Sequence, residues 1–113
     1  MSGSTFAARR SEILIGRIFF SDSPDGKARP CIVLSSERYN SQGYFLVVPI
    51  TSANDEFCLP MEKKDYEGFL FEGSMARFDC VVKMPSSQAI KRIGKVKSEF
   101  YGRLVEKIIS MVR

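Results

Sequence analysis

The sequence predicts an α+β fold, in which a small curved β-barrel is closed by an amphipathic helix at the C-terminal end. Two observations lead to this prediction. Up to residue 84, short runs rich in β-branched and aromatic residues alternate with turn-forming residues, as expected for the strands of a small barrel. After residue 97, apolar residues recur at helical spacing instead. We therefore expect a single domain over residues 1–113, with residues 1–10 frayed.

The first strands follow from short apolar runs. Residues 13–20 are predicted to form the first strand, with Gly16 at a bulge, and residues 21–28 are dense in turn formers and suit a loop of hairpin type. Residues 31–34 and 44–50 are β-branched or aromatic and have turn signals on both sides. These two runs are typical of buried central strands.

The connections and the later strands are more polar. Residues 36–43 form a polar connection, and Pro49 lacks an N–H, so we expect its strand to be exposed or bulged there. Residues 53–73 form a long acidic excursion around one short strand at 57–60. Residues 75–84 alternate between apolar and charged side chains, which predicts one strand with a core face and a charged face.

The last element is predicted to be a helix. Phe100, Leu104 and Ile108 recur four residues apart, and Ser98 is a suitable N-cap residue. Further apolar residues widen this stripe: Tyr101, Val105, Ile109 and Val112. An apolar stripe of this width is expected to cover the open side of the barrel.

Composition excludes several classes of protein. No run approaches the roughly 18 apolar residues that a membrane span needs, and residues 1–10 lack the apolar core of a secretory signal, so we expect a cytoplasmic protein without membrane contact. The three cysteines, Cys31, Cys58 and Cys80, are odd in number and form no Cys-x-x-Cys pair, which argues against disulfides and a zinc site. The chain has no histidine, which excludes the usual Ser-His and Cys-His nucleophile systems.

Charge is unevenly distributed along the chain. The net charge is +4, yet residues 86–113 hold seven basic residues against two acidic ones, and residues 53–73 hold six acidic residues against two basic ones. A basic C-terminal part indicates an anionic partner, either a nucleic acid or an acidic peptide. An ordinary solvated surface with uneven charge explains the same pattern.

Several short motifs occur in an order that resembles the MazF, Kid and PemK toxins. The resemblance covers residues 16–112, nearly the whole chain. Its motifs are Arg29-Pro30 before an apolar strand, Tyr39-Asn40, Pro49-Ile50-Thr51-Ser52, Gly73-Ser74 before Arg77 and Asp79, and Ile93-Gly94-Lys95 before the final helix.

This resemblance implies a fold, an activity and partners. The fold would be an SH3-like barrel, which this family shares with the CcdB toxins. The protein would be the toxin of a type II toxin–antitoxin system and a dimeric endoribonuclease that cleaves single-stranded mRNA at selected sequences. Attack by the 2′-hydroxyl would leave a 2′,3′-cyclic phosphate and a 5′-hydroxyl, with no metal and no cofactor. The partners would be RNA, an acidic antitoxin and a second copy of the chain, with DNA contacted only through the antitoxin complex.

The resemblance also implies site residues. The catalytic candidates are Arg29, Thr51, Arg77 and Asp79, and the RNA-binding candidates are Lys27, Ser52, Ser74 and Lys83. The chemistry suits these residue types, because Asp79 could accept the proton of the 2′-hydroxyl and the two arginines could stabilise the charge on phosphorus. Thr51 could add a neutral hydrogen bond. Arg77 and Asp79, two residues apart on a strand, also fit a solvent-facing salt bridge.

Other functions remain open at this point. A gyrase-poisoning toxin of the CcdB type has the same architecture but acts through a C-terminal end that includes a Trp, and this chain has none. A non-catalytic nucleic-acid-binding barrel could stack bases on exposed aromatics, for which Phe19, Phe20, Tyr44 and Phe69 are candidates. A metal-dependent nuclease would have to use the acidic residues between 55 and 72, which show no paired spacing on a rigid element.

Overall fold

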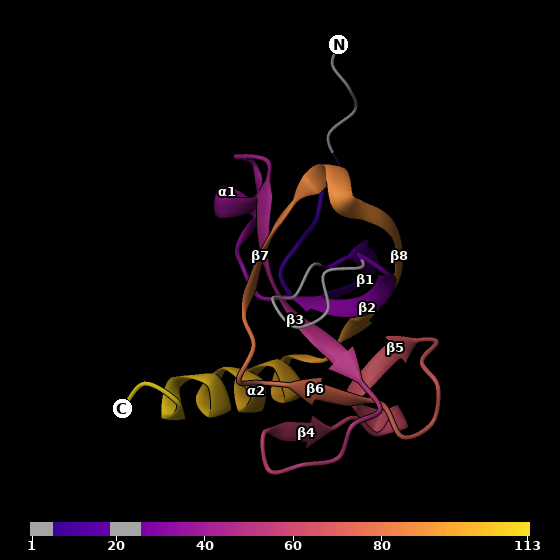
Figure 1. Cartoon of the computed structure of the whole chain (residues 1–113), viewed down its shortest axis with the longest axis vertical. Coiled ribbons are helices and arrows are strands. Elements are labelled where there is room, and N and C mark those ends of the chain that lie inside the picture. The colour runs from indigo at the N-terminus through magenta and orange to yellow at the C-terminus, as the bar shows by residue number, and fades with distance from the viewer. Residues whose placement is uncertain (1–5, 19–25) are drawn as a thin grey trace.

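The computed structural model describes residues 6–18 and 26–113 and contains one curled antiparallel sheet with a helix at its C-terminal end (Figure 1). Within these residues the sheet order is β4-β6-β3-β2-β1-β8-β5, and β7 pairs with β3 beside that path. The strands are β1 (Glu12–Arg17), β2 (Ala28–Val33), β3 (Tyr44–Thr51), β4 (Cys58–Pro60), β5 (Tyr66–Gly68), β6 (Met75–Arg77), β7 (Val82–Pro85) and β8 (Ala89–Val96). The helices are α1 (Glu37–Asn40) and α2 (Ser98–Ser110), with short 3-10 turns at Lys63–Asp65 and Ser86–Gln88.

The α+β prediction and the two central strands are confirmed. β2 and β3 cover most of the runs at 31–34 and 44–50, and β1 covers most of the strand predicted at 13–20, whose last residues lie outside the described ones. The β1–β8 register shifts between Ile15 and Gly16, which confirms an irregularity at Gly16. No helix in the described part of the chain is long and apolar enough to cross a membrane.

Strand β3 lies inside the sheet, and on the edge away from β2 its partner changes from β7 to β6 around Pro49. The sequence predicted an exposed or bulged strand there, which is wrong, because Pro49 is buried. Leu34 N donates to Leu46 O, so the alternation of hydrogen-bonded pairs turns the nitrogen of Pro49 away from β2. On that other edge β7 pairs with β3 only as far as Val47, and β6 pairs with it from Ile50. The missing N–H therefore falls in the gap between two partners.

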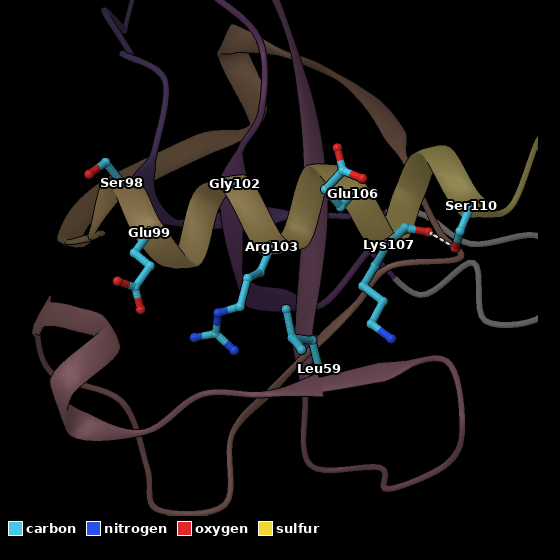
Figure 2. Close-up of a pocket in the computed structure, with 8 residues that line it drawn as sticks. All are labelled: Leu59, Ser98, Glu99, Gly102, Arg103, Glu106, Lys107 and Ser110. Atoms are coloured by element: carbon cyan, nitrogen blue, oxygen red, sulfur yellow. Dashed lines mark hydrogen bonds between the residues drawn. The ribbon is translucent and has the colours of Figure 1, made fainter.

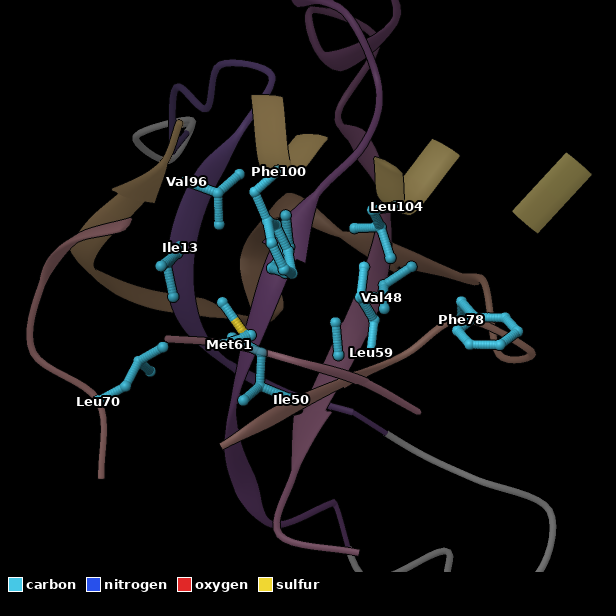
Figure 3. Close-up of a cluster of buried hydrophobic side chains, with 12 residues drawn as sticks. Ile13, Val48, Ile50, Leu59, Met61, Leu70, Phe78, Val96, Phe100 and Leu104 are labelled. Carbon is cyan, nitrogen blue, oxygen red and sulfur yellow. The ribbon is translucent and has the colours of Figure 1, made fainter. Parts of the chain in front are cut away.

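Two apolar clusters hold the sheet together. The larger one lies between the sheet and α2, where Phe100 and Leu104 of the helix pack against Ile13 and Val48 of the strands (Figure 3). The second fills the other side of the curled sheet and includes Phe45 with Ile18, just after β1, and other strand residues: Leu14, Cys31, Val33, Val47 and Met84. β3 contributes alternate residues to both clusters, as a strand buried on both faces must.

The structure corrects the predictions for the polar half of the chain. The single strand predicted at 75–84 is two strands, β6 and β7, which pair with different parts of β3 and are separated by a turn at residues 78 and 79. Strands β5 and β8 and helix α1 were not predicted. The acidic excursion holds β4, as expected, and also β5. In α2 the N-cap position belongs to Lys97, and Ser98 is the first helical residue.

The N-terminal segment is also better packed than predicted. Residues 1–5 lie outside the described residues, but residues 6–10 do not fray. Phe6 makes an edge-to-face contact with Phe45, and Ala8 is buried. Asn40 Nδ2 donates to Ala8 O, which ties this segment to α1. The prediction of a frayed segment over residues 1–10 is therefore wrong for its second half.

The backbones of the paired strands β5 and β8 approach each other so closely at one position that only glycine fits there. Gly68, with φ of 108°, lies opposite Gly94, and a Cβ at Gly94 would overlap the carbonyl oxygen of Glu67. A Cβ at Gly102, on the exposed face of α2, would meet no atom within 4 Å. The two glycines therefore predict opposite effects of the same substitution.

We expect Gly94→Ala to lower the free energy of unfolding by about 1–3 kcal/mol, because the backbone of β5 must move to make room. Gly102→Ala should raise it by about 0.5–1 kcal/mol, because alanine loses less conformational entropy in a helix. Urea unfolding of both variants beside the wild-type protein measures both effects. Equal stability of the two variants would contradict the close approach of the β5 and β8 backbones at Gly94.

Candidate functional site

The candidate site lies at the edge of the sheet where β2 begins and β3 ends. The antiparallel register pairs Cys31 of β2 with Pro49 of β3. This is the last pair of the β2–β3 ladder, and Arg29 and Thr51 each lie two residues beyond it, Arg29 on β2 and Thr51 on β3. On the other side of β3, Thr51 pairs with Met75 at the start of β6. Three strands from separate parts of the sequence therefore meet at one edge of the sheet.

Arg29, Thr51 and Arg77 share one face of the sheet at this edge. Ile50 and its partner Ala76 are buried in the cluster under α2. Side chains alternate along β3 and β6, so Thr51 and Arg77 lie on the opposite face. Arg29 shares that face, because Cys31, two residues along β2, packs with Val47 of β3 in the cluster on that side of the sheet. Two arginine side chains on one face, from the strands that flank the end of β3, can contact a common phosphate.

The hydroxyl of Thr51 is held in place by the turn that follows β3. Its Oγ1 accepts a hydrogen bond of 3.1 Å from the N–H of Ala53. The hydroxyl hydrogen can then be donated to an oxygen above the sheet, since a threonine hydroxyl both donates and accepts. Thr51 therefore suits the role of a neutral, oriented donor.

Arg77 is bound by two carboxylates. Its Nη2 lies 2.5 Å from Asp55 Oδ2 and its Nη1 lies 3.4 Å from Asp79 Oδ1. β6 ends at Arg77, so Asp79 lies in the following turn and not on the strand face where the sequence placed it. The solvent-facing salt bridge between Arg77 and Asp79 is thus present, but Asp55 is the closer partner. Two carboxylates and one guanidinium give this group a formal charge of −1.

Asp55 was not predicted as a site residue. It lies in the loop after β3, 22 residues before Arg77, and only the folded register of β4 against β6 brings the two together. The one local signal is its position just before a short strand, because aspartates often accept a backbone N–H two residues on, as Asp55 does from Phe57. That signal indicates a turn and not a site.

Arg29 and Cys31 occupy neighbouring positions on the same face of β2. Arg29 is half-buried and lies opposite Gly16, so the adjacent position on β1 carries no side chain. Cys31 is fully buried, and this burial raises the pKa of its thiol to about 12. The thiol is therefore neutral and out of reach near pH 7, and it does not suit the role of a nucleophile.

The predicted RNA-binding residues fall into two groups. Lys27 precedes β2 and Ser52 follows β3, both exposed at the edge that holds Arg29 and Thr51. Ser74 lies at the same edge before β6, where its hydroxyl donates to Phe71 O at 2.6 Å. Lys83 is separate from these, because it pairs with Leu46 on the opposite face of β3, and its ammonium lies 4.4 Å from the ring centroid of Tyr44. The structure therefore does not bring Lys83 to the site.

A hollow in the described surface lies elsewhere, between α2 and β4. It has a volume of about 760 Å³, and Figure 2 shows Arg103 and Lys107 extending from α2 toward Leu59 on β4 (Figure 2). Acidic and basic side chains alternate along this hollow, and Arg103 is paired with Asp65 at 3.0 Å. None of the predicted site residues lines it. We assign the chemistry to the sheet edge, where oriented donors and a carboxylate converge.

No metal site is evident among the residues that the structure describes. Among residues 6–18 and 26–113, no three His, Cys, Asp or Glu side chains come together in a way that could hold a metal ion. The polar groups that do converge at the sheet edge are two arginines, a threonine hydroxyl and two aspartates. This set offers positive charge for an oxyanion and carboxylates that can accept a proton.

Comparison with protein families gives one match over almost the whole chain. Residues 10–112 match the family described as "PemK-like, MazF-like toxin of type II toxin-antitoxin system". No curated protein sequence matches the chain. The family match covers every strand and helix described above.

Solved structures similar to the chain have the same fold. MazF in a MazE–MazF complex from Deinococcus radiodurans is 17% identical, with a TM-score of 0.71 over 95% of this chain and 96% of that chain. An endoribonuclease from a mycobacterial species is 13% identical, with a TM-score of 0.75 over 96% and 93%. The Mycobacterium tuberculosis toxin MazF-mt6 is 24% identical, with a TM-score of 0.69 over 86% and 91%. These likenesses confirm the fold predicted from the sequence.

Proposed function

Because the chain belongs to the PemK-like, MazF-like toxins of type II toxin–antitoxin systems, whose members are generally endoribonucleases, we propose that it cleaves single-stranded mRNA at selected sequences without a metal. The observation that carries the proposal is the strand register, which gathers Arg29, Thr51 and Arg77 on one face at one edge of the sheet. Each of these residue types binds phosphate oxygens.

In the proposed reaction the 2′-oxygen of the RNA attacks the adjacent phosphorus while the bond from phosphorus to the 5′-oxygen breaks. The proton of the 2′-hydroxyl passes to the Asp79 carboxylate, which later releases it to solvent, and the departing 5′-oxygen takes a proton from water to become a hydroxyl. The products are a 2′,3′-cyclic phosphate and a 5′-hydroxyl end. Attack by a hydroxyl of the substrate itself needs a base and stabilisation of charge, but no metal-bound water.

The two arginines supply the stabilisation of charge in this scheme. Negative charge builds on the phosphoryl oxygens as the 2′-oxygen attacks, and guanidinium groups held beforehand stabilise it without reorganising. Thr51 adds a hydrogen bond from a hydroxyl that the turn at Ala53 already orients. Lys27, Ser52 and Ser74 would bind the RNA backbone along the same edge, whereas the position of Lys83 gives it no direct part.

The proposal extends to partners and location. The exposed basic residues of β8 and α2 suit binding of an acidic antitoxin, and any contact with DNA would then pass through the antitoxin complex. Ile109, Met111 and Val112 are exposed apolar residues at the end of α2, between 36% and 84% exposed, and suit contact with a second copy. A cytoplasmic homodimer accounts for these features.

The purified protein should cleave single-stranded RNA in the presence of EDTA. The 2′,3′-cyclic phosphate at the new end can be identified by mass spectrometry. A substrate with one deoxyribose at the cleavage point should bind and remain intact, because the nucleophile is missing. A requirement for magnesium, or products with a plain 3′-hydroxyl, would refute the mechanism, and binding without any cleavage would favour a non-catalytic toxin or binding module.

Alanine substitutions should separate the roles of the site residues. Arg29→Ala should slow the chemical step by on the order of 10²–10³-fold, the usual loss when one fixed donor is removed. Thr51→Ala should cost less, because its hydrogen bond is neutral. Asp79→Ala should fold and bind RNA but cleave slowly. Single-turnover kinetics measure these rates. A near-normal rate for Asp79→Ala would show that Asp79 is not the base and only forms a salt bridge with Arg77.

The protein should be a two-fold dimer at micromolar concentration that buries more than about 1,000 Å². Light scattering measures the mass directly. Ile109→Asp should shift the mass toward the monomer, because a charge would be buried among apolar side chains. Lys91→Asp, on an exposed polar stretch of β8, is the control that should stay dimeric. A monomeric wild-type protein would contradict the proposed assembly.

A further inference from the structure

The strongest contact of Arg77 is with Asp55. Arg77 Nη2 lies 2.5 Å from Asp55 Oδ2 and Nη1 lies 3.4 Å from Oδ1, so both terminal nitrogens face the two oxygens of one carboxylate. Asp79 receives a single contact of 3.4 Å from Nη1. A fork of two parallel contacts fixes the plane of a guanidinium, which a single contact does not do.

Asp55 is itself fixed before it meets Arg77. Its Oδ1 accepts a hydrogen bond of 2.9 Å from the N–H of Phe57, two residues on. Its backbone oxygen accepts a hydrogen bond of 3.2 Å from the N–H of Cys58. Cys58 begins β4 and pairs with Arg77 in the β4–β6 register. The loop after β3 therefore returns to the sheet at the place where Arg77 lies, and it presents a carboxylate whose direction is already set.

This arrangement leaves one edge of the guanidinium for a substrate. Arginine has five N–H groups. The contacts to Asp55 and Asp79 use two hydrogens of Nη1 and one of Nη2, which leaves the Nε–H and the second hydrogen of Nη2 on the lateral edge. Two parallel N–H groups are the geometry that binds a phosphate in a bidentate way.

We propose that Asp55 is a positioning residue of this site, which holds Arg77 so that its lateral edge binds the scissile phosphate. The inference rests on the proposed RNA cleavage and adds a residue to it. Without Asp55 the long side chain of Arg77 would occupy several rotamers on the open sheet face. Binding the transition state would then cost the entropy of restricting it to one rotamer. Asp55 also places a negative charge beside a polyanionic substrate, so it weakens RNA binding while it speeds the chemical step.

Opposed effects on binding and on chemistry distinguish this role from a structural one. Asp55→Asn removes the charge but keeps an oxygen that can accept the N–H of Phe57, so the loop should remain folded. We expect this variant to bind a non-cleavable deoxy-substituted RNA about threefold more tightly and to lower kcat about tenfold. Glu56→Gln removes the same charge from the next, exposed residue and is the matched control. It should tighten binding to a similar extent and leave kcat unchanged.

A double-mutant cycle shows whether Asp55 acts through Arg77. Arg77→Ala should lower kcat about 10²-fold, and adding Asp55→Asn to it should cause no further loss, because the side chain that Asp55 holds is gone. Asp55→Glu restores the carboxylate on a longer stem and should recover part of the lost kcat. Thermal unfolding of every variant is measured in parallel.

The outcomes separate the inference from the function beneath it. If wild-type protein cleaves RNA and Asp55→Asn behaves like Glu56→Gln, Asp55 is only a surface charge and the inference is wrong. Additive losses in the double variant, or unfolding of Asp55→Asn, would also overturn it, the first because Asp55 would act independently and the second because its role would be structural. If the wild-type protein cleaves no RNA, the proposed function fails and the inference fails with it.

Discussion

The register of strand β3 is the constraint on which the rest of the structure depends. Its residues alternate between the cluster under α2 and the cluster on the other side of the sheet, so a shift of one residue would exchange the two sets. Pro49 adds a second restriction, because its missing N–H fits only where β7 ends and β6 begins. With β3 held in this way, Thr51 must lie between the start of β2 and the start of β6, and the side chains of three strands meet at one edge.

The electrostatics of this edge bear on two requirements of the proposed RNA cleavage. A strongly positive face would bind RNA tightly, but flexible cations contribute little to the transition state, because catalysis depends on donors that are already in place. Here Arg77 is held by two carboxylates at the expense of local positive charge. The excess of basic residues lies elsewhere, mainly on β8 and α2. In the proposed reaction, binding of the RNA chain and stabilisation of the reacting phosphate therefore fall to different side chains.

Much of the fold could be predicted from the sequence, because strands buried on both faces and an amphipathic helix leave clear apolar patterns. The missed elements lack such patterns. Lysines and an arginine interrupt β8, whose pairing with β1 is also irregular, and β5 and α1 have only three and four residues. The alternation of apolar and charged residues over 75–84 hid the turn at residues 78 and 79, because Phe78 in that turn is buried like a strand residue. Arg29, Thr51, Arg77 and Asp79 were expected from a family resemblance, whereas Asp55 reaches Arg77 only through tertiary pairing that no local spacing encodes.

The central claim is that one face of the sheet edge, and not the hollow along α2, binds RNA. The most direct measurement is the change in backbone amide NMR shifts when a 2′-deoxy-substituted oligonucleotide that cannot be cleaved is added to the labelled protein. The account predicts that the largest changes cluster at Arg29, at Thr51 and Ser52, and in the segment 74–79. Shift changes confined to α2 and β4, with Arg29 and Thr51 unaffected, would contradict binding at the sheet edge.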